Sequence, residues 1–509
     1  MKSRTRMWIN VVYLFATLAI PVGMPAQDNQ SPDHKHHQYK LIDIGTLGGP
    51  ASYYSAAGFG SQVLNDQGTV AGYGDTSMPD PYAPNCWDED CYLGRAFRWQ
   101  KGVLTDLGAL PGGYNSAVSA INARGWIAGF SQNGVIDPVT TLPATHAVLW
   151  KNRKPIDLGT LGGYVSNGVY VNDGGQVVGF STLNTDPDPF SLFGASVHAF
   201  LWQGGVMQDI GTLGGPDSVP TAGGINQRNG LIAGASYINS TPNPGTGIPT
   251  VDPFLWKNGT MTDLGTLGGT IGSASLANNR GQVAGVSDLA GDLISHPFLW
   301  KHGVMSDLGT LGGDNGTPAG LNDAGAVVGW ADLPGSQTFG AFLWKRGVMR
   351  YLGTIGSDPC SRARAINSHG QVVGSTSDCT FALHAFLWEK GGPMVDLNQL
   401  VQSSSGFQVL NADNINERGE IAGTGVPAGC DNIDTCGHVF LMIPCDENHR
   451  GECADTSMIE VSSPQASAAA AAYPATMKQG RESPLRAIDQ LRNRLMPRYH
   501  IPNGAKPSK

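Results

Sequence analysis

Short apolar segments alternate with glycine-rich or polar turns from residue 39 to residue 445. One example is the segment 297–300, Pro-Phe-Leu-Trp, which a tight turn connects to a second apolar segment at 304–308. Short apolar segments bounded by turn residues are typical of β-strands. Because side chains alternate between the two faces of a strand, the phenylalanine and tryptophan would share one face and the leucine would lie on the other. Both faces of the predicted sheets are therefore apolar, and both must be covered.

Three sequence signatures recur along this region, and each occurs eight times. They are an Asp-Leu-Gly-type element, an Asn-x-x-Gly turn that precedes an apolar segment, and Phe-Leu-Trp or a variant of it. From Asp263 to Asp307 is 44 residues, and from Asp307 to Tyr351 is 44 again. A repeat of this length predicts a propeller or a solenoid, in which neighbouring units cover each other's apolar faces. The asparagines of the second signature are Asn65, Asn122, Asn172, Asn226, Asn278, Asn322, Asn367 and Asn416.

One repeat unit contains four predicted strands. In one unit they span about 273–277, 282–286, 297–300 and 304–308. The first repeat element, 39–45, matches a fourth strand without the first three, and the last, 438–442, matches a third strand without a fourth. Pairing these ends would complete the eighth unit and remove the exposed strand edges. The sequence therefore predicts an all-β fold, an eight-bladed β-propeller of four-stranded blades over residues 39–445, closed by its N- and C-terminal strands.

The composition agrees with a large repeat domain. The 509 residues include 70 glycines, and 14% of the residues are charged, which suits short strands joined by tight turns. The net charge is −9 and the isoelectric point is about 5.7, so the chain lacks the basic surface that a general nucleic-acid binder needs.

Both ends of the chain differ from the repeats. Residues 1–26 predict a secretory signal peptide, because basic residues precede a short apolar segment and small residues follow it. An uncleaved membrane anchor is the alternative, and we expect no other transmembrane segment. We expect a disordered lead-in at 27–38 and a largely disordered tail at 446–509, in which 484–496 has the pattern of a short basic helix. Export predicts a secreted, periplasmic or cell-envelope location.

The eight cysteines fall as four pairs of sequence neighbours. In an exported protein they predict local disulfides that pin loops, although spacing alone does not determine which cysteines pair. A zinc site would need Cys-x-x-Cys or Cys/His ligand spacing, which the sequence lacks. The candidate pairs are Cys86 with Cys91, Cys360 with Cys379, Cys430 with Cys436, and Cys445 with Cys453.

A histidine precedes the Phe-Leu-Trp segment in several repeats. A set of metal ligands is one interpretation, but one histidine in each unit would be spread over the units. We expect each histidine to hydrogen-bond a neighbouring loop or aspartate, and we predict no metal or cofactor site. The Gly-Thr-Leu-Gly-Gly segments lack the Lys-Ser/Thr ending and the helix of a phosphate-binding loop. The histidines are His146, His198, His296, His384 and His438, and Arg95, Asp252 and Gly340 take this position in other repeats.

The loops between the predicted second and third strands vary in length and composition. Variable loops on a rigid scaffold commonly carry binding sites. Aromatic and acidic residues that look exposed in two of these loops predict contact with a carbohydrate or a peptide. The alternative is surface decoration pinned by disulfides. The candidate binding residues are Trp87, Asp88, Glu89, Asp90, Tyr92, Phe190 and Phe193.

The His-Ala-Phe-Leu-Trp segments at 198–202 and 384–388, together with the Asp-Leu-Gly-Thr-Leu-Gly-Gly elements, resemble the HAF family of extracellular repeat proteins. The resemblance covers residues 41–444. It implies an exported bacterial repeat protein and supplies no catalytic residues to transfer. The first unit departs from the pattern with Arg95 in place of histidine, and the last two lack the full glycine-rich loop.

These observations favour a non-catalytic binding or interaction scaffold, whose partner would be a carbohydrate or a protein of the cell envelope. A glycan hydrolase or lyase is the alternative. It would need non-repeated acids or a histidine that converge at the mouth of the channel. Residues 88–90 are the one acidic group that suggests such a site, and they lie within a single loop. A purely structural surface protein is a third interpretation.

Overall fold

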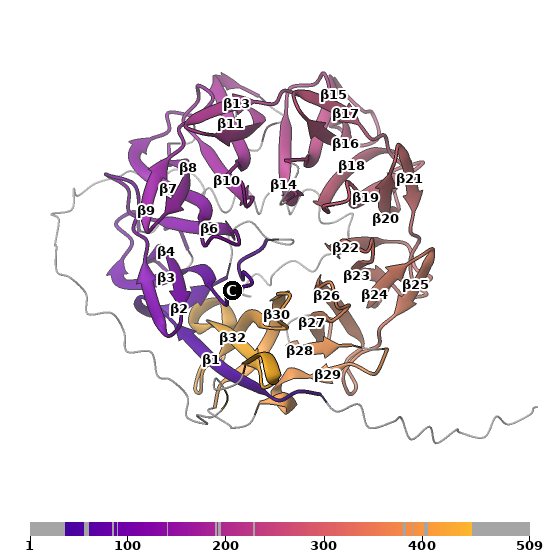
Figure 1. Ribbon diagram of the computed structural model, residues 1–509. Helices are drawn as coiled ribbons and strands as arrows, with labels where there is room; N and C mark the ends of the chain where they lie inside the picture. Colours follow the sequence, from indigo (N-terminus) through magenta and orange to yellow (C-terminus); the bar gives the residue numbers. More distant parts are fainter. Residues whose placement is uncertain are drawn as a thin grey trace, which may run out of the picture. The chain divides into compact units, whose positions relative to one another are not determined.

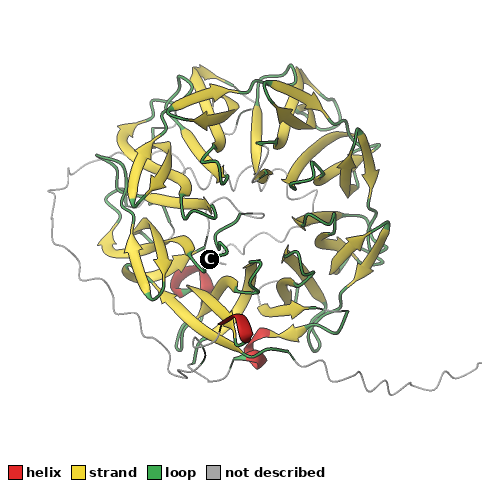
Figure 2. Cartoon of the chain, viewed as in Figure 1, coloured by secondary structure: helices red, strands yellow, loops and turns green. Residues whose placement is uncertain are grey.

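The computed structural model describes residues 36–449 and 453, except for 55–60, 84–85, 89, 140, 189–190, 192–194, 227–229, 380–382, 390 and 402–405. The predicted signal peptide, most of the lead-in and the predicted helix at 484–496 lie outside this part of the chain. The described residues are mostly strands and turns (Figure 2). They also form one short α-helix, α1 (Ile433–Cys436), and the 3₁₀ helices η1 (Leu397–Leu400) and η2 (Glu447–His449). No described helix is both long enough and apolar enough to span a membrane.

Consecutive strands form antiparallel sets of four (Figure 1). The first two sets contain β2 (Gly48–Tyr53), β3 (Val70–Pro79), β4 (Tyr92–Gln100), β5 (Val103–Asp106), and β6 (Ser116–Ile121), β7 (Ile127–Ile136), β8 (Pro143–Lys151), β9 (Lys154–Asp157). The next two contain β10 (Ser166–Val171), β11 (Val177–Pro187), β12 (Ala195–Gln203), β13 (Val206–Asp209), and β14 (Ser218–Ile225), β15 (Ile232–Pro242), β16 (Pro249–Lys257), β17 (Thr260–Asp263).

The remaining strands continue this order. They are β18 (Gly268–Ala277), β19 (Val283–Leu289), β20 (Ser295–Lys301), β21 (Val304–Asp307), then β22 (Gly316–Leu321), β23 (Val327–Asp332), β24 (Phe339–Lys345), β25 (Val348–Tyr351), and β26 (Cys360–Ile366), β27 (Val372–Ser377), β28 (Leu383–Trp388), β29 (Val395–Asp396). The last sheet contains β30 (Gln408–Ile415), β31 (Ile421–Val426), β32 (His438–Pro444) and the N-terminal strand β1 (Tyr39–Gly45). A parallel pairing of Val251 with Ile271 joins the β14–β17 and β18–β21 sets into one eight-stranded sheet.

The apolar faces of each sheet pack against both neighbouring sheets, as the strand pattern predicts. Phe298 is fully buried in a cluster with Ala233 and Leu264 of the preceding sheet. The next residue, Leu299, points to the other face and packs in a cluster with Phe342 of the following sheet. The glycine in the second strand makes room for this packing, because a Cβ on Gly285 would lie 2.7 Å from a ring carbon of Phe298.

The repeated asparagine has a second role beyond its turn. Asn278 Oδ1 accepts hydrogen bonds from the backbone N–H groups of Arg280 and Gln282, which fixes the turn between the first and second strands. Its Nδ2 also donates 3.0 Å to the backbone carbonyl of Asn322 in the next sheet. The described bonds of this kind run from Asn65 to Asn122, Asn122 to Asn172, Asn226 to Asn278, Asn278 to Asn322, Asn322 to Asn367, Asn367 to Asn416, and Asn416 to Asn65.

The N-terminal strand is the fourth strand of the last sheet, as the incomplete end repeats predict. β1 pairs antiparallel with β32, and Leu41 lies opposite Met442 (Figure 1). His438 Nδ1 lies 3.0 Å from Asp43 across this pairing. The two ends of the repeat region are therefore held in one sheet.

Four disulfides pin loops and strand ends. Each cysteine bonds to the sequence neighbour proposed for it, which confirms local pairing. One bond, Cys86–Cys91, lies between β3 and β4, and another, Cys360–Cys379, ties the start of β26 to the segment after β27.

Candidate functional site

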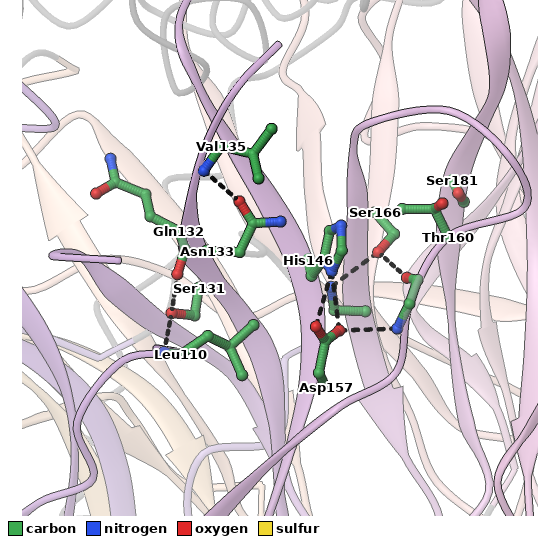
Figure 3. A network of polar contacts seen from close by, with 12 residues as sticks. Leu110, Ser131, Gln132, Asn133, Val135, His146, Asp157, Thr160, Ser166 and Ser181 are labelled. Atoms are coloured by element: carbon green, nitrogen blue, oxygen red, sulfur yellow. Dashed lines mark hydrogen bonds and ion pairs between the residues drawn. The ribbon is translucent and has the colours of Figure 1, made fainter. Parts of the chain in front are cut away.

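The repeated histidines bind the repeated aspartates across the third and fourth strands. His146 Nδ1 lies 2.9 Å from Asp157 Oδ1, which also accepts a hydrogen bond from the Gly159 N–H (Figure 3). Burial acts to raise the pKa of Asp157, but the bonds from His146 and Gly159 outweigh it and leave that pKa below its ordinary value. This confirms the predicted hydrogen bond between the histidine and an aspartate. Equivalent pairs are His198–Asp209, His296–Asp307 and His438–Asp43, whereas His384 instead binds Asp358.

Where another residue replaces the histidine, the contact with the fourth strand differs, as two sheets show. Asp252 faces Asp263, and burial together with that second carboxylate raises the pKa of Asp252 to about 7. Gly340 leaves space for an aromatic ring, since a Cβ there would lie 2.4 Å from a ring carbon of Tyr351. Each pair stays within one sheet. In the described part of the chain, no group of three His, Cys, Asp or Glu side chains is placed to hold a metal ion.

The glycine-rich segments use their polar groups internally. Thr310 Oγ1 donates 2.6 Å to the Gly313 carbonyl, and the Gly309 N–H donates 2.7 Å to the side chain of Asp307. These contacts close each segment on itself as it crosses to the next sheet. They agree with the sequence argument against a phosphate-binding loop.

The disulfide-pinned loop between β3 and β4 folds inward, which corrects the expectation that its tryptophan is exposed. Trp87 is 4% exposed, and its ring lies 5.5 Å from that of Phe130. The backbone N–H of Trp87 donates to Asp80 Oδ2, so a buried carboxylate holds the loop against the sheet. Of the other candidate binding residues, Asp88, Asp90 and Tyr92 are half-buried, and Glu89, Phe190 and Phe193 lie outside the described residues.

The acids of this loop meet a carboxyl group from β3. Asp75 is fully buried, and burial together with the nearby carboxylates of Asp90 and Asp88 raises the pKa of Asp75 to about 9. Asp75 also accepts a hydrogen bond from the Ala51 N–H, in the way that Gln132 accepts one from the Asn115 N–H in the next sheet. Since the same position has the same backbone partner in both sheets, we interpret Asp75 as a structural acid.

Polar side chains that are not repeated gather elsewhere, on first strands of neighbouring sheets. In each sheet, the second strand carries a glycine that lies opposite the phenylalanine of the third strand or its replacement. One residue of the first strand lies opposite the residue that directly follows this glycine. This register position holds Tyr53, Ala117, Asn167, Val219, Ser273, Thr317, Arg362 and Asn411. Arg362 is the one charged residue of these eight. It lies on β26, which contacts β30.

Arg364 and Asp413 occupy equivalent bulges on β26 and β30. The strand register shifts at both residues, and Arg364 Nε lies 4.0 Å from Asp413 Oδ1. A bulge redirects a side chain and is common next to functional sites. The same bulge carries uncharged residues in other sheets, namely Ser119, Val169, Ser275 and Ala319.

Aromatic rings flank the two arginines. The guanidinium carbon of Arg362 lies 4.3 Å from the ring centre of Phe339 and 5.6 Å from that of Trp330. Burial, together with the adjacent charge of Arg364, lowers the pKa of Arg362 to about 9. None of the described residues accepts a hydrogen bond from Nε or Nη2 of Arg362. Two like charges thus lie close together in a largely apolar setting.

Asp413 supplies the acid of this group. Burial raises its pKa to about 6, although Arg364 and hydrogen bonds from Asn411 and Tyr54 act in the opposite direction. The Asn411 bond measures 2.7 Å, and Tyr54 follows directly after β2. We call these five residues, Tyr54, Arg362, Arg364, Asn411 and Asp413, the arginine cluster. The cluster joins the first sheet and the last two in chain order.

The sequence-based prediction placed the binding residues in loops and did not include the arginine cluster. Arg362 and Arg364 lie inside a strand, in the segment Cys-Ser-Arg-Ala-Arg. One signal was present: aligning the eight repeats on their Asn-x-x-Gly turns puts Arg362 and Arg364 where the first six units carry uncharged residues and where the last unit carries Asn411 and Asp413.

Comparison with known proteins indicates a fold type but no family. No family profile matches the sequence, and no curated protein is detectably similar to it. Solved structures that resemble it include a puromycin-hydrolyzing peptidase of Mycobacterium tuberculosis, with 12% identity and a TM-score of 0.39 over 76% of this chain and 62% of the peptidase. The chain thus spans less than two thirds of that peptidase's length.

Two further structures show the same kind of likeness. The β-propeller domain of the Trilobed protease from Pyrococcus furiosus, which has an open velcro topology, is 9% identical with a TM-score of 0.38, over 71% of this chain and 97% of that domain. A gluconolactonase from Xanthomonas campestris is 8% identical with a TM-score of 0.27, over 80% of this chain and 90% of its own. The strands of this protein make it all-β, and the solved structures that resemble it include a β-propeller domain.

These neighbours correct one expectation. The prediction that the protein has no catalytic activity is contradicted, because its structural neighbours include peptidases and gluconolactonases. The resemblance to HAF repeats stays a prediction, since no family match bears on it.

Proposed function

We propose that this protein is an exported β-propeller enzyme that acts on a glycan, as a hydrolase or a lyase, and that the arginine cluster is its active site. The observation that carries the proposal is the convergence of five non-repeated polar residues from three sheets. Residues that recur from sheet to sheet form the scaffold. Non-repeated residues that lie close together are therefore the best candidates for a catalytic role. Perturbed acids beside charged partners are typical of functional sites.

Asp413 has the properties of a general acid or base. A carboxyl group with a pKa of about 6 can both hold and release a proton near neutral pH. The adjacent Arg364 stabilises its charged form, and the Tyr54 hydroxyl provides a second proton-bearing group within hydrogen-bond reach of the same carboxyl. Aromatic rings next to these groups offer the flat surfaces on which sugar rings commonly stack.

The scaffold for this site is inferred to be a closed eight-bladed propeller. Its support is the asparagine series, which returns from Asn416 to Asn65, and the pairing of β1 with β32. Closure brings β26 and β30 of the last two units next to Tyr54 of the first. Without it, the cluster would be divided between the two ends of the chain.

Export is part of the proposal. Four disulfides are compatible with an extracellular or periplasmic protein. The loops between second and third strands, including the one pinned by Cys86–Cys91, would then make further contacts with a long polymer. Glycans of the cell envelope or its surroundings are the matching substrates.

A polysaccharide panel tests the proposal. The mature chain from residue 27 is incubated with neutral and acidic polysaccharides, and new reducing ends and unsaturated products are measured. We expect cleavage of at least one polymer, and Asp413→Asn should lower the rate by about 10²-fold or more. Ser275→Ala, at the equivalent bulge of another sheet, should retain the wild-type rate. Absence of cleavage across the panel, or equal rates in both variants, would overturn the proposal.

A further inference from the structure

We infer that Arg362 and Arg364 form a recognition site for a carboxylate, so that the ligand of this protein is an acidic glycan built from uronate units. The inference rests on the proposed function for the identity of the polymer, but the anion site itself stands on separate observations. These concern the charge balance of the cluster, the free edge of one guanidinium, and the rings that hold it.

The charge balance of the cluster favours an anion. Asp413 lies beside Arg364, with its Oδ1 4.0 Å from Arg364 Nε. The charged neighbour that acts on Arg362 is Arg364, a like charge. The side chains of Arg364 and Asp413 are 13% and 3% exposed, so water screens these charges poorly. The protein as a whole carries a net charge of −9, which makes this local positive charge a specific feature.

The shape of the free edge favours a carboxylate. Nε and Nη2 form the side-on edge of a guanidinium, and both lack an acceptor among the described residues at Arg362. This edge presents two parallel N–H groups, which match the two oxygens of a planar carboxylate. Both atoms are shielded from water, so the ligand must displace a covering side chain to reach them. Leaving buried donors unpaired is costly, and a bound carboxylate would remove that cost.

The aromatic rings orient the edge. Phe339 lies 4.3 Å from the Arg362 guanidinium carbon, and Trp330 lies 5.6 Å and 5.8 Å from those of Arg362 and Arg364. The Cys360–Cys379 disulfide, two residues before Arg362, packs in the same cluster as both rings. A fixed arginine loses less conformational freedom on binding than a mobile one. The rings therefore hold the Arg362 guanidinium in place, while the group that covers its side-on edge must still move when an anion binds.

Calorimetry of the mature chain with hexagalacturonate, a hexamer of neutral galactose and a sulfated galactose hexamer tests the inference. Asp413→Asn serves as the background, so that the ligands are not consumed. We expect hexagalacturonate to bind and the neutral hexamer to bind at least tenfold more weakly. Arg362→Gln should weaken hexagalacturonate binding by about 10- to 100-fold. Arg362→Lys keeps the charge but loses the side-on edge, and should give an intermediate affinity.

Controls separate the possible failures. Thr317→Ala, at the register position of Arg362 in another sheet, should leave affinity unchanged, and thermal unfolding shows whether each variant folds. Equal binding of the sulfated hexamer would overturn the assignment to carboxylate. Cleavage of neutral polymers without any effect of Arg362→Gln would overturn the anion site and leave the proposed function intact. Arg362-dependent binding of hexagalacturonate without cleavage of any polymer would support the site and defeat the enzyme proposal.

Discussion

Asn416 donates a hydrogen bond of 3.0 Å to the backbone carbonyl of Asn65, a residue 351 positions earlier in the chain. The same bond links neighbouring sheets elsewhere, for example Asn322 to Asn367 at 3.1 Å. The contact between the last and first asparagines therefore repeats the geometry of the internal contacts. It is the observation that most supports a closed scaffold.

Replacing Asn416 with alanine should destabilise the protein as much as the same change at an internal position. Either change removes a buried amide that donates to the backbone carbonyl of another asparagine, which costs about 1 kcal/mol, because that carbonyl keeps its hydrogen bond from the Gly68 or Gly370 N–H. Loss of the turn contacts adds to this cost in both variants. Chemical denaturation of Asn416→Ala and Asn322→Ala provides the comparison. A neutral effect at Asn416 alone would show that the first and last units do not pack in solution as the internal ones do.

Asp252 should make stability fall as the pH rises. Its folded-state pKa is raised to about 7, so the folded protein holds a proton that the unfolded chain releases at a lower pH. The stabilisation is complete below the ordinary pKa of about 4 and is lost as the pH rises through 7. Asp252→Asn should therefore gain stability relative to the wild type between these values and keep that gain above them. Unfolding free energies from pH 4 to 8 measure the difference; a constant offset would argue against the raised pKa of Asp252.

The second-strand glycine beneath the arginine cluster should tolerate no side chain. A Cβ on Gly374 would lie 2.0 Å from the Arg362 carbonyl oxygen and 2.9 Å from a ring carbon of Phe386. Gly374→Ala should cost about 1–3 kcal/mol through overpacking. Gly245 is the control, because its Cβ would meet its nearest atom, Asn243 Oδ1, at 3.3 Å. If both variants unfold at the same temperature as the wild type, the close packing of these strands is wrong.

Features that recur among the repeat units could be predicted from this one sequence, because its eight repeat units can be compared with one another. The Phe298 packing, the pairing of His146 with an aspartate and the joining of β1 to β32 all follow from positions that recur. The incomplete end repeats predict closure for the same reason, and closure stays a prediction.

The site residues could not be found this way. Arg364 and Asp413 are 49 positions apart, and no local pattern says that their bulges face each other. Trp87 was misjudged because a tryptophan in a polar loop looks exposed, whereas the Cys86–Cys91 bond and Asp80 turn it inward. Contacts between non-repeated residues depend on the tertiary structure. The repeat pattern predicts the strands but not which non-repeated side chains meet.

The pH dependence of glycan cleavage tests the central claim most directly. With Asp413 as the acid–base group, kcat/KM of the wild type should show a limb at pH about 6. Arg364 lowers the pKa of Asp413, so in Arg364→Gln this limb should move to higher pH, while Ser275→Ala should leave it in place. A limb that stays at the wild-type position in Arg364→Gln, or no cleavage by the wild type at any pH, would contradict a catalytic role for the arginine cluster.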